Sequence, residues 1–78
     1  MARIIIANTT REDKGRNQVH DIARATYTTF TSDNDVFFQI DTYGRSRRNH
    51  PEKISQSIQL DRNSAILLID ILKREFSL

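Results

Sequence analysis

The stretch VFFQIDTY, residues 36–43, decides the fold of this 78-residue chain. Apolar residues occupy every second position of its first half, and the residues between them are polar or aromatic. Because successive side chains of a β-strand point to opposite faces, this alternation predicts a strand with two chemically different sides. One side carries Val36, Phe38 and Ile40, and the other carries Phe37, Gln39, Asp41 and Tyr43.

A second strand is expected downstream, at residues 54–60. Ile54, Ile58 and Leu60 lie on one face of this segment, and serine and glutamine side chains lie on the other. The connection over residues 44–51 is polar and rich in turn-favouring residues. The two strands are therefore predicted to form an antiparallel hairpin with a long tip.

Upstream of the central stretch, residues 19–30 are rich in threonine, tyrosine and small side chains. The run TYTTF at residues 26–30 predicts a strand for at least the second half of this segment, whereas residues 18–25 are also compatible with a helix. Residues 32–35, SDND, supply turn chemistry. The β-branched residues within 3–7 predict a short buried strand, and a polar loop follows it.

The last element is predicted to be a helix. Asp61 is a suitable N-cap, and Lys73 and Arg74 lie near the other end, where positive charge is favourable. At about 100° per residue, one apolar stripe covers roughly a third of the circumference. We expect this stripe to pack on the sheet; it consists of Ala65, Leu68, Ile69, Leu72 and Phe76.

Leu67 and Ile71 form a second apolar patch outside that stripe. Either the sheet curls around the helix and covers them, or the patch meets a second copy of the chain. A chain this short has a marginal core, and it has no cysteine for disulfides and no metal-like spacing of ligands. Self-association is the remaining source of stability, so we predict a homodimer with Leu67 and Ile71 at its interface.

Together these elements predict one domain, residues 1–78, of α+β class: an antiparallel sheet of about four strands with one C-terminal amphipathic helix packed on one face. The longest apolar run has four residues, which is too short for a membrane span. The absence of cysteine and of a secretion signal favours the cytoplasm.

Enzyme-like features are sparse in this sequence. No nucleophile lies in a recognisable elbow, and two glycines are too few for the usual phosphate-cradling loop. His20 and Asp21 are adjacent, so in a strand they point to opposite faces, and His50 lies beside proline in a basic loop. We therefore expect no catalytic activity, no metal and no small-molecule cofactor.

Positive charge gathers in two predicted loops, although the net charge is only +2. The loop before the second strand carries Arg45, Arg47, Arg48 and Lys53, and the earlier loop carries Arg11, Lys14 and Arg16. Flexible cations of this kind suit phosphate contacts that follow a nucleic-acid backbone without reading its sequence. The alternative interpretation is that polar loops collect arginine for solubility.

Phe37 and Tyr43 stand among small polar side chains on the expected outer face of the hairpin. Exposed aromatic rings in such surroundings stack on unpaired bases, which single strands offer and duplexes do not. The alternative is a cross-strand aromatic cluster or a dimer contact. The combination of this face with neighbouring cationic loops favours nucleic-acid binding.

The order of elements resembles the single-stranded-DNA-binding transcriptional coactivator family, positive cofactor four and its bacterial relatives. The resemblance covers residues 36–76, and it depends on the Phe38-Gln39-Ile40 strand, the cationic stretch 45–53 and the Ile58-x-Leu60-Asp61 entry to the helix. It implies a homodimer packed through its helices, with a curved sheet that holds single strands. The implied backbone contacts are Arg45, Arg47, Arg48 and Lys53.

The chain differs from this family at Ser57, where glycine is usual, and in having no tryptophan. The sequence as a whole predicts a homodimer that binds single-stranded DNA or RNA without sequence preference. Its expected contacts are Arg45, Arg47, Arg48, Lys53, Lys14 and Arg16 for phosphate and Phe37 and Tyr43 for bases. The alternative function is a small dimeric protein-interaction module, of a regulatory or phage type, with no nucleic-acid binding.

Overall fold

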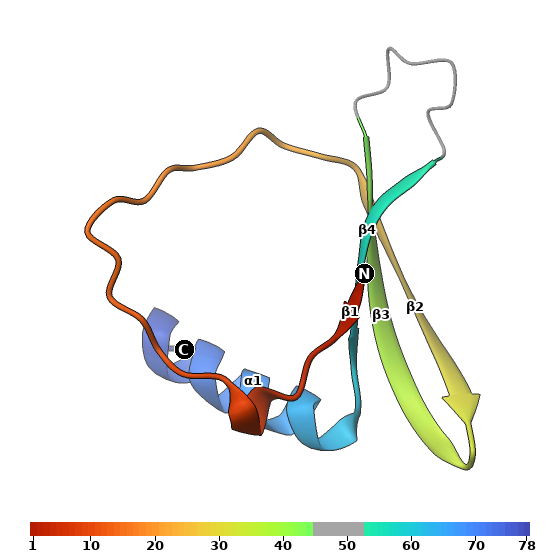
Figure 1. Cartoon of the computed structure of the whole chain (residues 1–78). Coiled ribbons are helices and arrows are strands. Elements are labelled where there is room, and N and C mark those ends of the chain that lie inside the picture. Colours follow the sequence, from red (N-terminus) through yellow and green to blue (C-terminus); the bar gives the residue numbers. More distant parts are fainter. Residues whose placement is uncertain (45–52) are drawn as a thin grey trace.

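A computed structural model describes residues 1–44 and 53–78. It confirms the expected α+β class, with a four-stranded sheet and one C-terminal helix (Figure 1). The elements are β1 (Ala2–Arg3), a 3-10 turn (Ile6–Asn8), β2 (Ala25–Ser32), β3 (Asp35–Tyr43), β4 (Ile54–Leu60) and α1 (Arg62–Phe76). The strand order in the sheet is β1-β4-β3-β2, and only the β1–β4 pair is parallel.

The hairpin of β2 and β3 is closed by a two-residue turn. Ser32 pairs with Asp35, and between them Asp33 and Asn34 have φ of 51° and 67°. Left-handed backbone at both central residues is the mark of a type I′ turn, which matches the twist of the strands it joins. Asp and Asn tolerate this conformation better than most residues do, so SDND sets the register of the whole pair.

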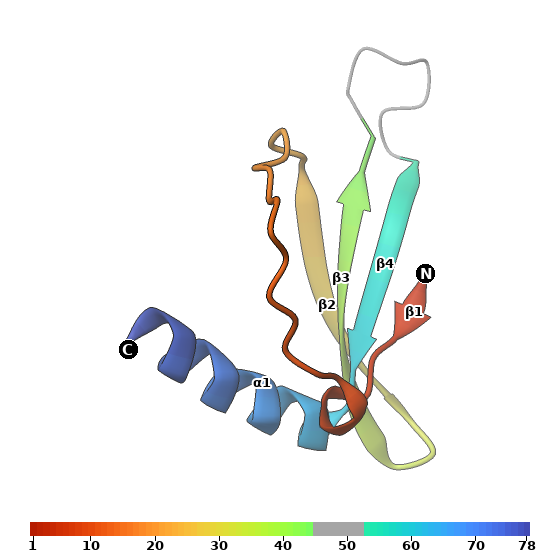
Figure 2. The ribbon, with the colours of Figure 1, turned by 60° about the vertical axis from the view of Figure 1, so that its left-hand side comes forward.

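The pairing of β3 with β4 is antiparallel, as expected, with an irregularity between Thr42 and Tyr43. The segment 3–7 differs from its prediction, because only Ala2–Arg3 joins the sheet, and it joins as an exposed edge strand. The backbone N–H of Ile4 still donates to the Gln59 carbonyl, 3.0 Å away, and the chain then turns into the 3-10 segment. The 3-10 segment lies against α1, so this run contributes to the helix rather than to a buried strand (Figure 2).

The sheet has two distinct faces, which follow directly from the register. We call one the apolar face; its members are Ala25, Tyr27, Thr29, Thr31, Val36, Phe38, Ile40, Thr42, Gln56, Ile58 and Leu60. We call the other the polar-aromatic face; its members are Arg3, Thr26, Thr28, Phe30, Phe37, Gln39, Asp41, Tyr43, Ser57 and Gln59. Val36, Phe38 and Ile40 therefore point away from Phe37 and Tyr43, as predicted.

The helix begins immediately after β4, and its N-cap is Asp61, as predicted. The Asp61 carboxylate accepts a hydrogen bond of 2.8 Å from the Ser64 backbone N–H. This bond, with help from the nearby Arg3 guanidinium, holds the pKa of Asp61 below its usual value. Lys73 and Arg74 lie in the last turn, where they complement the helix dipole.

One side of α1 lies along the N-terminal segment. The Ser64 hydroxyl accepts a hydrogen bond of 3.0 Å from the Ile6 backbone N–H, and three turns later Glu75 pairs with Arg11 at 3.5 Å. Residues 64, 68, 71 and 75 share one side of a helix by their spacing. Ile71 is accordingly half-buried, whereas Leu67 is exposed.

The apolar stripe of α1 does not lie on the sheet in the single chain. Ile69 is 52% exposed and Phe76 is 70% exposed. The helix leaves the end of the sheet at an angle and meets it only near its first turn (Figures 1 and 2). The physical reason is the connection: a single capping residue separates the end of β4 from the start of α1, so the helix has no length of chain with which to fold back.

Candidate nucleic-acid interface

Two phenylalanine rings stack on the polar-aromatic face. Phe30 of β2 and Phe37 of β3 are directly opposite in the register, with ring centroids 5.5 Å apart and planes 23° from parallel. Phe37 is partly exposed and Phe30 is 38% exposed, so neither ring is enclosed in the interior. Phe37 is therefore part of a cross-strand aromatic cluster, but its ring partner is Phe30, and Tyr43 does not belong to the pair.

An arginine lies over each of the two predicted stacking rings. The Arg3 guanidinium carbon is 5.2 Å from the Phe37 ring centroid, and the Arg24 guanidinium carbon is 4.3 Å from that of Tyr43. Both distances are within the range of a cation–π contact. Each contact joins a flat π-surface to a positive charge, and these are the two groups that a base and its phosphate require.

The Tyr43 ring is held in place from two directions. Its hydroxyl lies 3.0 Å from the Thr26 hydroxyl across the β2–β3 pair. Arg24 lies one residue before β2, and its backbone carbonyl accepts a hydrogen bond of 3.0 Å from the Tyr43 N–H. The Arg24 side chain lies over the Tyr43 ring. The ring is therefore oriented before any ligand arrives, which lowers the entropy cost of binding.

A chain of side-chain hydrogen bonds crosses the centre of the same face. Gln59 donates to Gln39 over 2.7 Å, Gln39 donates to Asp41 over 2.8 Å, and the Ser57 hydroxyl donates to the same Asp41 oxygen. Asp41 is only 8% exposed, so its charge is both hydrogen-bonded and shielded by its neighbours. A satisfied network of this kind fixes the amide groups of both glutamines at the surface.

The predicted phosphate contacts are only partly brought together. Arg45, Arg47 and Arg48 lie outside the described residues. Lys53 is exposed and immediately precedes β4, at the far end of the sheet from the helix.

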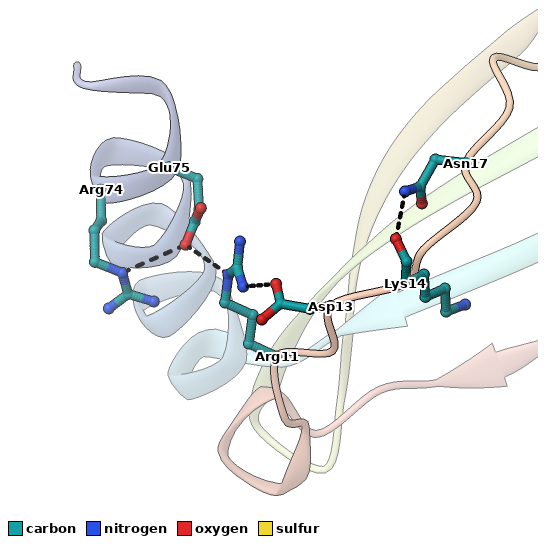
Figure 3. Close-up of polar contacts among 6 residues, drawn as sticks. All are labelled: Arg11, Asp13, Lys14, Asn17, Arg74 and Glu75. Carbon is teal, nitrogen blue, oxygen red and sulfur yellow. Dashed lines mark hydrogen bonds and ion pairs between the residues drawn. The ribbon is translucent and has the colours of Figure 1, made fainter.

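Lys14 and Arg16 do not adjoin the polar-aromatic face. They lie on the exposed segment that runs on the side of the sheet from which the helix projects (Figures 1 and 3). The Lys14 carbonyl accepts a hydrogen bond of 3.0 Å from the Asn17 side chain. Arg11, on the same segment, pairs with Asp13 and Glu75 (Figure 3). The fold thus assigns these cations to a different surface from the aromatic rings.

Sequence reasoning missed Arg3, Arg24 and Phe30 as members of this face. Alternation along residues 22–30 puts Arg24 and Phe30 on the same face of the expected strand, so the sequence already indicates that these two residues lie together. No comparable signal existed for Arg3, because its neighbours come from β4, 56 residues later in the chain.

No family model, no curated protein and no solved structure matches this chain. Within residues 1–44 and 53–78, no three histidine or acidic side chains gather in a way that suits a metal ion. Of the helices in these same ranges, none has the length and apolar character needed to cross a bilayer.

Proposed function

We propose that this chain is a non-catalytic homodimeric module that binds single-stranded DNA or RNA on its polar-aromatic face without reading base sequence. The observation that carries the proposal is the repeated pairing of a guanidinium with an aromatic ring, Arg3 with Phe37 and Arg24 with Tyr43. Unpaired bases stack on rings and on guanidinium planes, and each stacked base contributes about 1–3 kcal/mol.

The chemistry of this face favours single strands over duplexes. Bases in a duplex are stacked on one another and do not present their faces to a flat protein surface. The Phe30–Phe37 pair and Tyr43 lie toward opposite ends of the same face, with the hydrogen-bonded glutamine row between them, and an extended single strand can reach both. Arg3, Arg24 and Lys53 then supply phosphate contacts, and Arg45, Arg47 and Arg48 remain candidates from their sequence position.

The test is a binding titration with a labelled single-stranded oligothymidylate and with the matching duplex. We expect the single strand to bind more tightly. Three phosphate contacts per chain predict that log affinity falls with log salt with a slope of about −2. Affinity that hardly changes between low and physiological salt contradicts the phosphate contacts.

A matched pair of arginine variants separates the two cationic regions. Arg24→Gln removes the charge over Tyr43, and we expect a loss of at least several-fold in affinity for the oligonucleotide. Arg16→Gln removes an equal charge from the segment on the other side of the sheet and is expected to leave affinity nearly unchanged. Equal losses in both variants indicate non-specific attraction by net charge instead of a defined interface.

The rival function is a protein-interaction module that binds no nucleic acid. The open apolar surface of sheet and helix favours it, because large uncovered apolar patches mark association sites. If the parent protein retains neither single-stranded nor duplex oligonucleotide at low salt, the rival is correct and the polar-aromatic face has another role.

A further inference from the structure

The described chain exposes far more surface than a compact protein of its size. A folded monomer of 9.1 kDa has an accessible surface of about 4,900 Å², whereas this chain has 7313 Å². Its radius of gyration is 14.9 Å, against about 11.5 Å for a compact domain of 78 residues. Leu60, 8% exposed, is the only buried large hydrophobic residue in the parts that the structure describes. The single chain therefore lacks a closed core.

The missing core has two uncovered walls. One wall is the apolar face of the sheet, on which no described strand residue carries a charge. The other is the apolar stripe of α1. The angle between them holds a cavity of about 580 Å³ in which Val36, Phe38 and Leu60 of the sheet meet Ala65 of the helix. The cavity is open, so the apolar face and the helix stripe are both exposed to solvent in the single chain.

The helix cannot close this angle within its own chain. Asp61 is the only residue between β4 and α1, and its cap bond to Ser64 sets the direction of the first turn. The N-terminal segment then holds a neighbouring side of the helix, about 100° around the axis from Ile69 and Leu72, through Ile6 at one end and Arg11 at the other. The stripe is thus presented toward the space above the apolar face, but it does not reach that face.

We propose that α1 of a second copy fills this angle, so that each chain covers the apolar face of the other with its own helix stripe. This inference deepens the homodimer of the proposed function, on which it rests. A two-fold axis makes the two helix-on-sheet contacts equivalent, so the apolar face and the helix stripe of both copies are covered. This is the arrangement of an isologous interface. The chains exchange helices, and neither has a complete core alone.

The dimensions of the elements support a second copy as the occupant. The 15 residues of α1 span about 22 Å, and the 8 residues of β2 span about 27 Å, so one helix covers most of the length of the face. The excess surface of roughly 2,400 Å² per chain includes the exposed segment 9–24, and it is large enough to contain the roughly 800 Å² that each partner buries in a standard interface.

The interface is therefore centred on Ile69, Leu72 and Phe76 instead of on the predicted Leu67 and Ile71. The spacing of the first three puts them on the wall that faces the cavity, together with Ala65. Ile71 lies on the side already occupied by the N-terminal segment. Ile71 of the second apolar patch is thus half-buried within its own chain, whereas Ile69, Leu72 and Phe76 of the main stripe are exposed.

The test uses the absence of cysteine from the chain. Ile69→Cys, from the helix stripe, and Ile40→Cys, from the apolar face, are made in separate chains, one of them isotopically labelled. The two are unfolded, refolded together and treated with a short bis-maleimide. We expect a covalent species of twice 9.1 kDa that contains one chain of each kind. In the control, Thr28→Cys on the polar-aromatic face replaces Ile40→Cys, and we expect little cross-linking to Ile69→Cys.

Sedimentation and thermal unfolding of the unmodified chain complete the test. We expect the dimer mass and a Tm that rises with protein concentration, because folding and association are coupled. Three results overturn the inference. The first is a cooperatively folding monomer with a constant Tm. The second is a cross-link within one chain in the double variant Ile40→Cys/Ile69→Cys at low concentration. The third is a dimer in which the control pair links as well as the test pair.

Failure of this inference and failure of the proposed function give different results. A helix-exchanged dimer that binds no oligonucleotide contradicts nucleic-acid binding alone. Salt-dependent binding of a single strand by a monomer, or by a dimer with another interface, contradicts the helix exchange alone. A rival arrangement is a dimer in which the apolar face is covered by residues 12–24 of its own chain, which include the exposed Val19 and Ile22. That dimer does not give the expected cross-link, so it contradicts the helix exchange.

Discussion

The two faces of the sheet are made from neighbouring residues of the same strands, yet they offer different chemistry. Phe38 stacks on Tyr27 on the apolar face, with ring centroids 5.6 Å apart, and Phe37 stacks on Phe30 on the polar-aromatic face at 5.5 Å. The geometry of the two ring pairs is nearly the same. Their surroundings differ: the first pair has aliphatic neighbours, and the second has an arginine and a hydrogen-bonded row of glutamines. The two proposals therefore assign similar ring pairs to different purposes: the Tyr27–Phe38 pair to a dimer interface and the Phe30–Phe37 pair to a binding surface.

The largest expected effect comes from truncating the two neighbouring phenylalanines. Phe38→Ala removes a ring from the apolar face, and we expect it to lower the free energy of unfolding of the dimer by about 3–5 kcal/mol, as for a core phenylalanine. Phe37→Ala is expected to have a smaller effect on unfolding but to weaken oligonucleotide binding by about 1–3 kcal/mol. Chemical denaturation and the oligothymidylate titration measure the two quantities. If the two variants lose the same property, the faces do not have separate roles.

A smaller effect is expected from placing the same new charge on each face. Thr28 and Thr29 are adjacent in β2, both are exposed in the single chain, and they point to opposite faces. Thr29→Lys puts an ammonium group where the partner helix is proposed to lie, so the dimer should weaken because that charge loses water. Thr28→Lys adds a cation beside the aromatic rings, so affinity for the single strand should rise and the salt slope should steepen.

Sedimentation and the salt-dependent titration distinguish these two lysine variants. Thr28→Lys should sediment as the parent protein does, which makes it the control for the strand propensity that is lost when a threonine of β2 is replaced by lysine. A dimer equally weakened by both substitutions means that the proposed partner helix does not lie on the apolar face.

The smallest expected effect concerns the direction of the helix, which decides whether its stripe faces the apolar side. The pKa of Asp61 is lowered in the fold, mainly by the Ser64 backbone N–H, so the ionised form is the one that stabilises the native state. Its contribution is complete above the usual pKa near 3.8 and is lost as the pH falls through the lowered value in the fold. Asp61→Asn keeps a capping oxygen but does not titrate.

We therefore expect the Tm of the parent to exceed that of Asp61→Asn at neutral pH and the difference to shrink in acid. Thermal unfolding at a fixed protein concentration, followed over a series of pH values, measures this. A difference that stays constant with pH means that the charge of Asp61 does not contribute to capping.

Local patterns determined the elements of this protein. The alternation in residues 36–43 and 54–60 predicted β3 and β4 and the members of their two faces, and the structure confirms both strands. SDND predicted a turn, and Asp61 predicted the start of the helix. All of these depend on residues close together in sequence, for which the period of two in strands and the capping bond are sufficient information.

Tertiary structure alone decided where these elements lie relative to one another. The stripe of α1 predicted a covered helix, but the angle at Asp61 leaves the stripe open, and the N-terminal segment occupies a different side. Likewise, only the fold brings Arg3 beside Phe37 and carries the segment with Lys14 and Arg16 along the side of the sheet from which the helix projects (Figure 1). A periodic pattern predicts that one face of an element is buried, but it does not predict which other element or chain covers that face. That depends on the direction in which the chain leaves each element and on contacts between residues far apart in sequence.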